Sequence, residues 1–273
     1  MGVYALHLDT GEAIAVLADR RFPTASVIKT AVLVELFHQL ESGRLRRDRR
    51  LSLAEEVKVG GSGVLHGISA GTALTLLDLA YLMIAVSDNT ATNMLIAEVG
   101  TRAVDDRMAA MGLPQTRLYR PTFRGGKADV FPEEEREFGL GSSTPREMAR
   151  LMAKIARGEA ASPRASEEML ALLARQQDRD MIPRLLPSGE DGPRVAHKTG
   201  TDEEKLPDQG GMRGAVRADA GVVTTKAGRY AIAIFARRVR DPRWTPDNEA
   251  LTTGAAVSRM IYDHFLAARS AGH

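Results

Sequence analysis

Residues 3–8 alternate in the manner of a β-strand, and strand-like stretches return in the last third of the chain. The first alternating stretch runs into Asp9-Thr10-Gly11-Glu12, a turn sequence typical of a hairpin. Three further stretches lie in the last third of the chain. Together they predict one antiparallel sheet of about five strands. The predicted strands cover residues 3–8, 13–18, 194–199, 214–224 and 230–239.

Apolar residues in the middle of the chain instead recur at helical spacing, with capping signals at segment ends. Thr75 and Asp78 form a capping box, and Thr144-Pro145 followed by Glu147 gives an N-cap, an N1 proline and an N3 glutamate. Residues 113–141 have no clean period, so we expect a long loop there. Helices are expected over about residues 26–41, 75–86, 90–99, 101–111, 144–158, 166–175 and 248–268.

This order of elements predicts an α/β fold of the α+β type. Helices would flank an antiparallel sheet of about five strands, and a largely helical domain would be inserted into it. We expect residues 1–25 and 194–273 to form the α/β domain, with the terminal helix covering the sheet. Residues 26–193 would form the helical domain.

The composition is that of an ordinary globular protein, with 273 residues, 44% hydrophobic, 26% charged and a net charge of +2. So small a net charge gives no reason to expect nucleic acid as a partner, and only the basic run 44–50 points the other way. Because the chain has no cysteine, thiol catalysis, disulfides and cysteine metal sites are excluded. No apolar run approaches the roughly 20 residues of a membrane span.

We expect no metal and no cofactor. The histidines lack metal-ligand spacing, and no glycine-rich phosphate loop follows a predicted strand. His197 precedes Lys198 on a predicted strand, so their side chains should point to opposite faces of the sheet. The histidines are His7, His38, His66, His197, His264 and His273.

Ser26 and Lys29 stand at the start of the first predicted helix, which is apolar almost all round over residues 31–37 and should be buried. Residues three positions apart share a helix face, which places the amine beside the hydroxyl. A desolvated amine loses its proton more easily and can accept one from the serine, and the helix N-terminus favours the developing negative charge. The pair therefore suits a serine nucleophile with a lysine base, although an isolated Ser-x-x-Lys is more often a helix cap and a solvated lysine.

Two further polar clusters lie at element boundaries: Ser87-Asp88-Asn89 between two helices, and Lys198-Thr199-Gly200-Thr201 on a strand. Each alone is a weak signal. Together with Ser26-x-x-Lys29, and in this order, they resemble the signature set of class A β-lactamases and penicillin-binding proteins. The resemblance covers nearly the whole chain, with support from residues 74–80 and from Thr144-Pro145. It implies a β-lactamase-like fold.

The resemblance implies catalytic roles for four residues. Ser26 would attack a carbonyl and become acylated, with Lys29 as the base or proton relay. Ser87 would relay a proton to the leaving nitrogen. Lys198 would hold a substrate carboxylate by its charge.

The resemblance also implies substrate-binding residues. Asn89 would bind the substrate amide and help to position the lysine base, and Thr199 would hydrogen-bond the carboxylate. Gly200 would let the substrate backbone lie against the strand, and the Thr201 N–H would form the oxyanion hole with that of the nucleophile. Arg217 would add a carboxylate contact or else be an exposed strand arginine, and the sequence leaves both open.

Two departures from the family pattern matter. Class A enzymes carry a Glu-x-x-Leu-Asn element before the Thr-Pro helix, whose glutamate activates the water that frees the acyl-enzyme. Residues 129–141 hold acids without that pattern, so we expect a solvated acidic loop and slow deacylation. The second departure is an acidic insertion over residues 202–211 that could fence the active-site edge. The open candidates for a deacylation base are Glu133, Glu134, Glu135 and Glu137.

The expected function is that of a serine hydrolase that opens β-lactam rings through an acyl-serine intermediate. The same site would suit a D-alanyl-peptide hydrolase, a transpeptidase or an esterase, and a non-catalytic penicillin-binding sensor is the second alternative. We expect a monomer with a small-molecule β-lactam or peptidoglycan-like substrate, no nucleic acid and no membrane span. The resemblance implies a periplasmic or secreted location, although no signal peptide appears in the sequence.

Overall fold

A five-stranded antiparallel sheet forms the centre of the molecule, with strand order β2-β1-β10-β9-β8. The computed structural model describes residues 1–123, 130–190, 192–205 and 213–270. The N-terminal hairpin joins the C-terminal strands through β1 and β10, so the predicted sheet is confirmed. Its strands are β1 Gly2–His7, β2 Ala13–Val16, β8 Arg194–Lys205, β9 Arg213–Thr225 and β10 Gly228–Val239.

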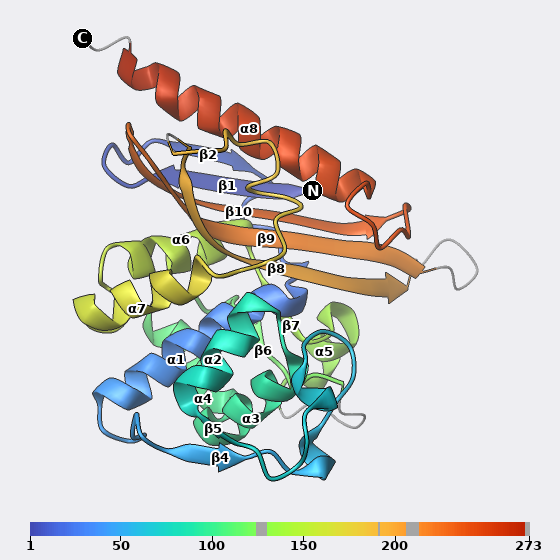
Figure 1. The fold of residues 1–273 in the computed structure, drawn as a ribbon. Coiled ribbons are helices and arrows are strands. Elements are labelled where there is room, and N and C mark those ends of the chain that lie inside the picture. Colours follow the sequence, from blue (N-terminus) through green and yellow to red (C-terminus); the bar gives the residue numbers. More distant parts are fainter. Residues whose placement is uncertain (124–129, 191, 206–212, 271–273) are drawn as a thin grey trace.

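Helices cover both faces of this sheet (Figure 1). The terminal helix α8, Glu249–Ser270, lies across one face, as expected, and α6 lies against the other together with the helical part of the chain. None of the helices in the described ranges is both long enough and apolar enough for a membrane crossing. The other helices are α1 Lys29–Glu41, α2 Leu76–Ala85, α3 Asn89–Val99, α4 Thr101–Ala110, α5 Pro132–Phe138, α6 Pro145–Ala156 and α7 Pro163–Leu173, with short 3-10 turns η1 Ala25–Ile28, η2 Glu55–Val57 and η3 Leu65–Gly67.

Helix α1 is the core of the helical part, and every residue from 31 to 37 is buried, as its apolar pattern predicts. The one acid on this stretch, Glu35, is 2% exposed. Its carboxylate accepts hydrogen bonds from Gln39 Nε2 at 2.8 Å and Arg107 Nε at 3.0 Å, which offset its burial. The buried helix thereby holds the residues at its N-terminus in one place.

Three sequence predictions about element bounds are wrong in part. Residues 113–141 are not one long loop, because they contain β6 Arg117–Leu118, α5 and the start of β7 Gly141–Ser143. In a small sheet, β7 pairs with β6 on one side and with β3 Phe22–Pro23 on the other. Residues 202–205 continue β8 instead of opening an insertion, and residues 206–211 lie outside the described ranges. Helix α7 begins at Pro163, where Ser162 Oγ accepts the Ala165 N–H at 3.1 Å. A third, two-stranded sheet joins β4 Arg50–Ser52 and β5 Ala73–Thr75.

The capping signals are confirmed. The capping box of Thr75 and Asp78 opens α2, and Thr144 Oγ1 accepts the Glu147 N–H at 3.1 Å at the start of α6. The division of the chain into residues 1–25 with 194–273 and residues 26–193 stays a prediction.

Candidate active site

The 3-10 turn η1, which contains Ser26, packs closely against strand β8. Ala25, just before the serine, has a left-handed backbone with φ of 44°, which is strained for a residue with a side chain. On the strand side, a Cβ at Gly200 would collide with the Thr24 carbonyl oxygen and lie 3.1 Å from the Ser26 backbone nitrogen. Only glycine allows this approach, so Gly200 brings the backbone of β8 against that of the serine.

Lys29 is fully buried at the first position of α1. Its Nζ donates hydrogen bonds to the carbonyl oxygen of Ser87 at 2.7 Å, to Ser87 Oγ at 3.1 Å and to Asn89 Oδ1 at 2.9 Å. Burial, and then the positive charge of Lys198, holds the pKa of this amine well below its usual range. The amine is therefore connected to the second polar cluster and can exist in its neutral form.

The Ser87-Asp88-Asn89 loop is fixed from several sides. Ser87 has a left-handed φ of 56°, and Asp88 caps α3 by accepting the Ala91 N–H at 2.8 Å. The other oxygen of Asp88 accepts the N–H groups of residues 64 and 65 at 2.6 and 2.8 Å. Asn89 Nδ2 donates to the Gly60 carbonyl at 3.1 Å. Strained backbone held in this way is typical of functional sites.

The third cluster lies on β8. Lys198 is fully buried, its Nζ donates to the Thr199 carbonyl at 2.8 Å, and burial lowers its pKa to about 8. His197 points to the other face of the sheet, where its Nδ1 lies 2.9 Å from Asp219 Oδ1. The alternation that was predicted for His197 and Lys198 is confirmed.

Ser26 lies where two clefts meet. The first has a volume of about 370 Å³ and the second about 360 Å³. The Ser26 hydroxyl makes no hydrogen bond within the described part of the chain, so it caps no helix. The first cleft is lined by polar side chains, including those of Ser62, Ser87, Gln176, Asp178, Thr199 and Thr201. The second is lined by Asn89, Arg120, Thr122, Phe123, Leu140 and Trp244, among others.

A family model described as the beta-lactamase enzyme family matches residues 1–265. The chain belongs to this family. Curated relatives include the beta-lactamase CARB-3 of Pseudomonas aeruginosa, 26% identical over 193 residues, and a beta-lactamase of Streptomyces lavendulae, 29% identical over 195 residues. Each match covers 69% of this chain, and the chain spans 64% and 61% of these relatives' lengths, less than two thirds.

Solved structures support the same fold. The beta-lactamase from Sphaerobacter thermophilus is 32% identical with a TM-score of 0.79, covering 94% of this chain and 89% of that one. The structure of PBP-A is 31% identical with a TM-score of 0.76, covering 97% of this chain and 89% of that one. The predicted β-lactamase-like fold is therefore confirmed.

Arg217 is 1% exposed in this family member, so its interpretation as an exposed strand arginine is wrong. Its guanidinium donates to the carbonyl oxygens of Val216 at 2.9 Å, Asp202 at 3.2 Å and Arg243 at 2.7 Å. It pairs across the sheet with Thr201, which lines both clefts. Arg217 thus lies beside the site and supports its edge, and its contact with a substrate carboxylate stays a prediction.

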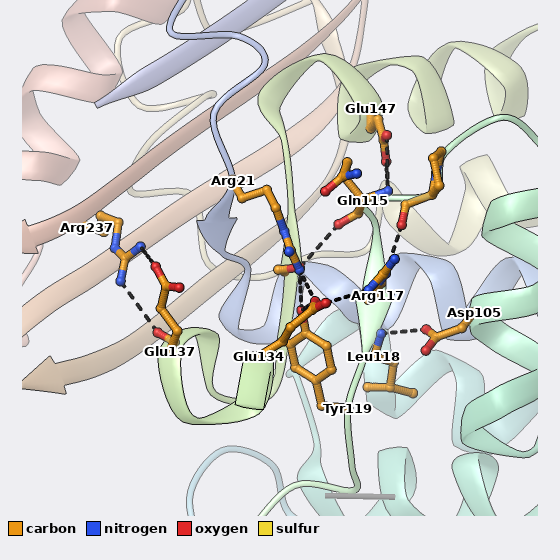
Figure 2. A network of polar contacts seen from close by, with 12 residues as sticks. Arg21, Asp105, Gln115, Arg117, Leu118, Tyr119, Glu134, Glu137, Glu147 and Arg237 are labelled. Atoms are coloured by element: carbon orange, nitrogen blue, oxygen red, sulfur yellow. Dashed lines mark hydrogen bonds and ion pairs between the residues drawn. The ribbon is translucent and has the colours of Figure 1, made fainter. Parts of the chain in front are cut away.

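The acidic segment that was expected to be a solvated loop is mostly helix α5 (Figure 2). Glu134 is bound by Arg21, by Arg117 Nη1 at 2.6 Å and by the Tyr119 hydroxyl at 2.9 Å. A solvated loop is therefore the wrong description for Glu134 and for Glu135, which Arg120 Nε contacts at 2.7 Å. Glu133 pairs with Arg136 and Glu137 with Arg237, and none of the four glutamates lines either cleft in the described ranges.

Sequence reasoning missed several residues that line the clefts. Thr122 lies with Ser26 in the second cleft, and the Asn93 side chain holds its backbone, with distances of 2.7 Å to its N–H and 2.9 Å to its carbonyl. Phe123 follows it. Trp244 stands out in the sequence only as the single tryptophan of the chain. These residues lie in irregular segments that are distant in sequence from the three clusters, so no spacing pattern could identify them.

Proposed function

We propose that this protein is a serine hydrolase that opens β-lactam rings through an acyl-serine intermediate. The observation that carries the proposal is the buried Lys29 amine, which is bonded to Ser87 and Asn89 at the cleft that Ser26 lines. A solved PBP-A mutant, 32% identical to this chain, is an acyl-enzyme complex with penicillin G. That neighbour supports the same first step here.

In the proposed acylation, Ser26 Oγ forms a bond to the lactam carbonyl carbon while its proton passes to the neutral amine of Lys29. The ring C–N bond then breaks, and the proton reaches the leaving nitrogen through Ser87 Oγ, 3.1 Å from the Lys29 Nζ. The backbone N–H groups of Ser26 and Thr201 would stabilise the oxyanion. Thr199 and the Lys198 charge would hold the carboxylate.

Deacylation is the weak step of the proposed cycle. A positioned base contributes roughly 10²–10⁴-fold to such a step. Within the described residues none of the four candidate glutamates lines either cleft, and each is paired with an arginine, although Arg120, the partner of Glu135, lines the second cleft. The segment before α5 contributes Thr122 to that cleft. We therefore propose that the acyl-enzyme forms readily and is hydrolysed slowly.

The same feature favours a D-alanyl-peptide hydrolase or transpeptidase as the second candidate, since such an enzyme uses the acyl-serine without needing fast β-lactam turnover. A peptidoglycan-like substrate and a periplasmic or secreted location belong to this proposal. A monomeric state belongs to it as well. Fast cleavage of a D-alanyl peptide or ester beside slow turnover of a cephalosporin would favour the second candidate.

Intact mass with penicillin over time tests the proposal. We expect the wild-type mass to rise by one penicillin, and Ser26→Ala to show no adduct while remaining folded, because the serine hydroxyl caps no helix. Ser87→Ala is the matched control, expected to acylate slowly because water can replace a proton relay. An adduct on the Ser26→Ala protein would overturn the assignment of the nucleophile.

A further inference from the structure

Two aromatic side chains stand in the second cleft beside Ser26. Phe123 comes from the segment before α5, and Trp244 from the connection between β10 and α8. They are 68% and 62% exposed, so neither ring contributes much to the core. Large exposed aromatic rings that line a cleft are available for a ligand.

Two residues of strands β8 and β9, Glu203 and Arg217, fix the position of the Trp244 ring. The Arg217 guanidinium lies over its ring, 5.1 Å from the centroid, and the indole N–H donates to Glu203 Oε1 at 2.9 Å. Because Arg217 is buried and bonded to three carbonyl oxygens, it is a fixed support for the ring. The ring therefore has a set orientation while most of its surface stays open.

The backbone of Phe123 adopts a conformation that is unfavourable for a residue with a large side chain. Its φ of 47° is left-handed, which is rare for a bulky residue. Its ring lies over the bare Cα of Gly61, where a Cβ would be 2.8 Å from the ring. Unlike Phe131, whose backbone is also left-handed and whose ring is also exposed, Phe123 lines the second cleft beside Ser26, where its ring is available to a ligand.

The two clefts suit different parts of a β-lactam substrate, the first its carboxylate and the second its acyl side chain. Thr199 lines the first cleft and Lys198 is its neighbour on β8, which suits the substrate carboxylate. A substrate attacked at Ser26 with its carboxylate there must extend its acyl side chain into the second cleft, between Asn89 and the two aromatic rings. Ala25 and Leu140 add apolar surface to that cleft.

We infer that Phe123 and Trp244 form a binding site for an aryl group on the acyl side chain, and that the preferred substrates are β-lactams with such a side chain. This inference rests on the proposed acylation of Ser26. Ring stacking and burial favour the aryl compound in acylation by about tenfold over one with a small aliphatic side chain. The rings determine specificity and take no part in the chemistry.

The test compares two penicillins with the same nucleus, amide and carboxylate, one with a phenylacetyl and one with an acetyl side chain. Acylation kcat/KM is measured for wild type, Phe123→Ala, Trp244→Ala and the double variant. We expect the double variant to lose about tenfold with the phenylacetyl compound and less than about twofold with the acetyl compound. Phe131→Ala is the control, because this phenylalanine is also exposed but lines neither cleft.

A direct readout comes from the chain's single tryptophan. Acylation by the phenylacetyl compound should shift the Trp244 emission to shorter wavelength, whereas the acetyl compound should leave it nearly unchanged. Equal rates for both compounds in wild type, or equal losses in the double variant, would overturn the aryl site while leaving the proposed function intact. Failure of both compounds to acylate wild type would overturn the proposed function and this inference with it.

Discussion

Lys29 and Lys198 are both fully buried, and each has a depressed pKa because burial disfavours its charge. The proposed chemistry needs the two amines in opposite protonation states. Lys29 must be neutral to take the Ser26 proton, whereas Lys198 must be charged to hold a carboxylate. The positive charge of Lys198 further lowers the pKa of Lys29, so the charged state of the one favours the neutral state of the other.

The two lysines predict a bell-shaped pH profile of acylation by a carboxylate-bearing β-lactam. The rate should rise with pH as Lys29 loses its proton, and fall above a pKa of about 8 as Lys198 loses its charge. A neutral ester of the same nucleus should lack the alkaline limb. Lys198→Ala should cost about tenfold or more with the anionic substrate, since a charge-assisted hydrogen bond is worth about 1.5–3 kcal/mol. Equal losses of rate with both substrates would mean that Lys198 takes part in proton transfer or stabilises the fold instead of binding the carboxylate.

Thr122 is a second position where a single residue should decide the rate. Thr122 lines the cleft with Ser26. Its hydroxyl donates to Asn93 Oδ1 at 2.9 Å, and the Asn93 side chain also bonds the Thr122 N–H and carbonyl. A glutamate here would carry a carboxylate into that cleft. We predict that Thr122→Glu speeds deacylation by about 10²-fold, the low end for a positioned base, with Thr122→Gln as the uncharged control. Single-turnover release of penicilloate measures the effect, and equal rates for the two variants would refute it.

The residues of the three clusters could be predicted because the members of each cluster are close together in the sequence. Ser26 and Lys29 are one helical turn apart, and the other two clusters are contiguous. The sequence offered Arg217 as a candidate but could not predict its burial, which depends on carbonyl groups from three separate segments. It gave no signal for Trp244 beyond its being the single tryptophan.

At the level of elements, the acidic helix α5 shows why the loop prediction failed. It has seven residues, too short for an apolar period, and three of its four glutamates pair with arginines outside the helix. Arg21 approaches Glu134 from before β3, and Arg117 approaches it from β6 (Figure 2). Ion pairs between such separated segments leave no local signal.

This network predicts separate effects on stability and catalysis. Glu134→Gln should leave Arg21 and Arg117 without their shared carboxylate and destabilise the fold by about 1–2 kcal/mol, discounted for partial exposure. It should change deacylation by less than about 10²-fold, as should substitutions of the other three glutamates. Glu133→Gln is the control, because that carboxylate is 78% exposed and its loss should cost at most about 0.5 kcal/mol. Denaturant unfolding and the deacylation rate would be measured together, and a collapse of deacylation in one variant would reveal a hidden base.

For the whole molecule, the sheet and the terminal helix were predictable, because strand-like segments at both chain ends have few ways to be buried except in one sheet. The strand order was not, since it depends on β1 entering between β2 and β10. The site depends on this large-scale assembly. Gly200 on β8 and Ser26 before α1 are far apart in sequence and meet only when the helical part docks on the sheet.

The central claim is that acylation has complete machinery here while deacylation does not. Stopped-flow mixing with a chromogenic cephalosporin tests it most directly, because a burst measures the first step and the following steady state measures the second. We predict a burst equal to the enzyme concentration, followed by slow turnover. Fast turnover without a burst, abolished when one of the four glutamates is changed to glutamine, would contradict the claim.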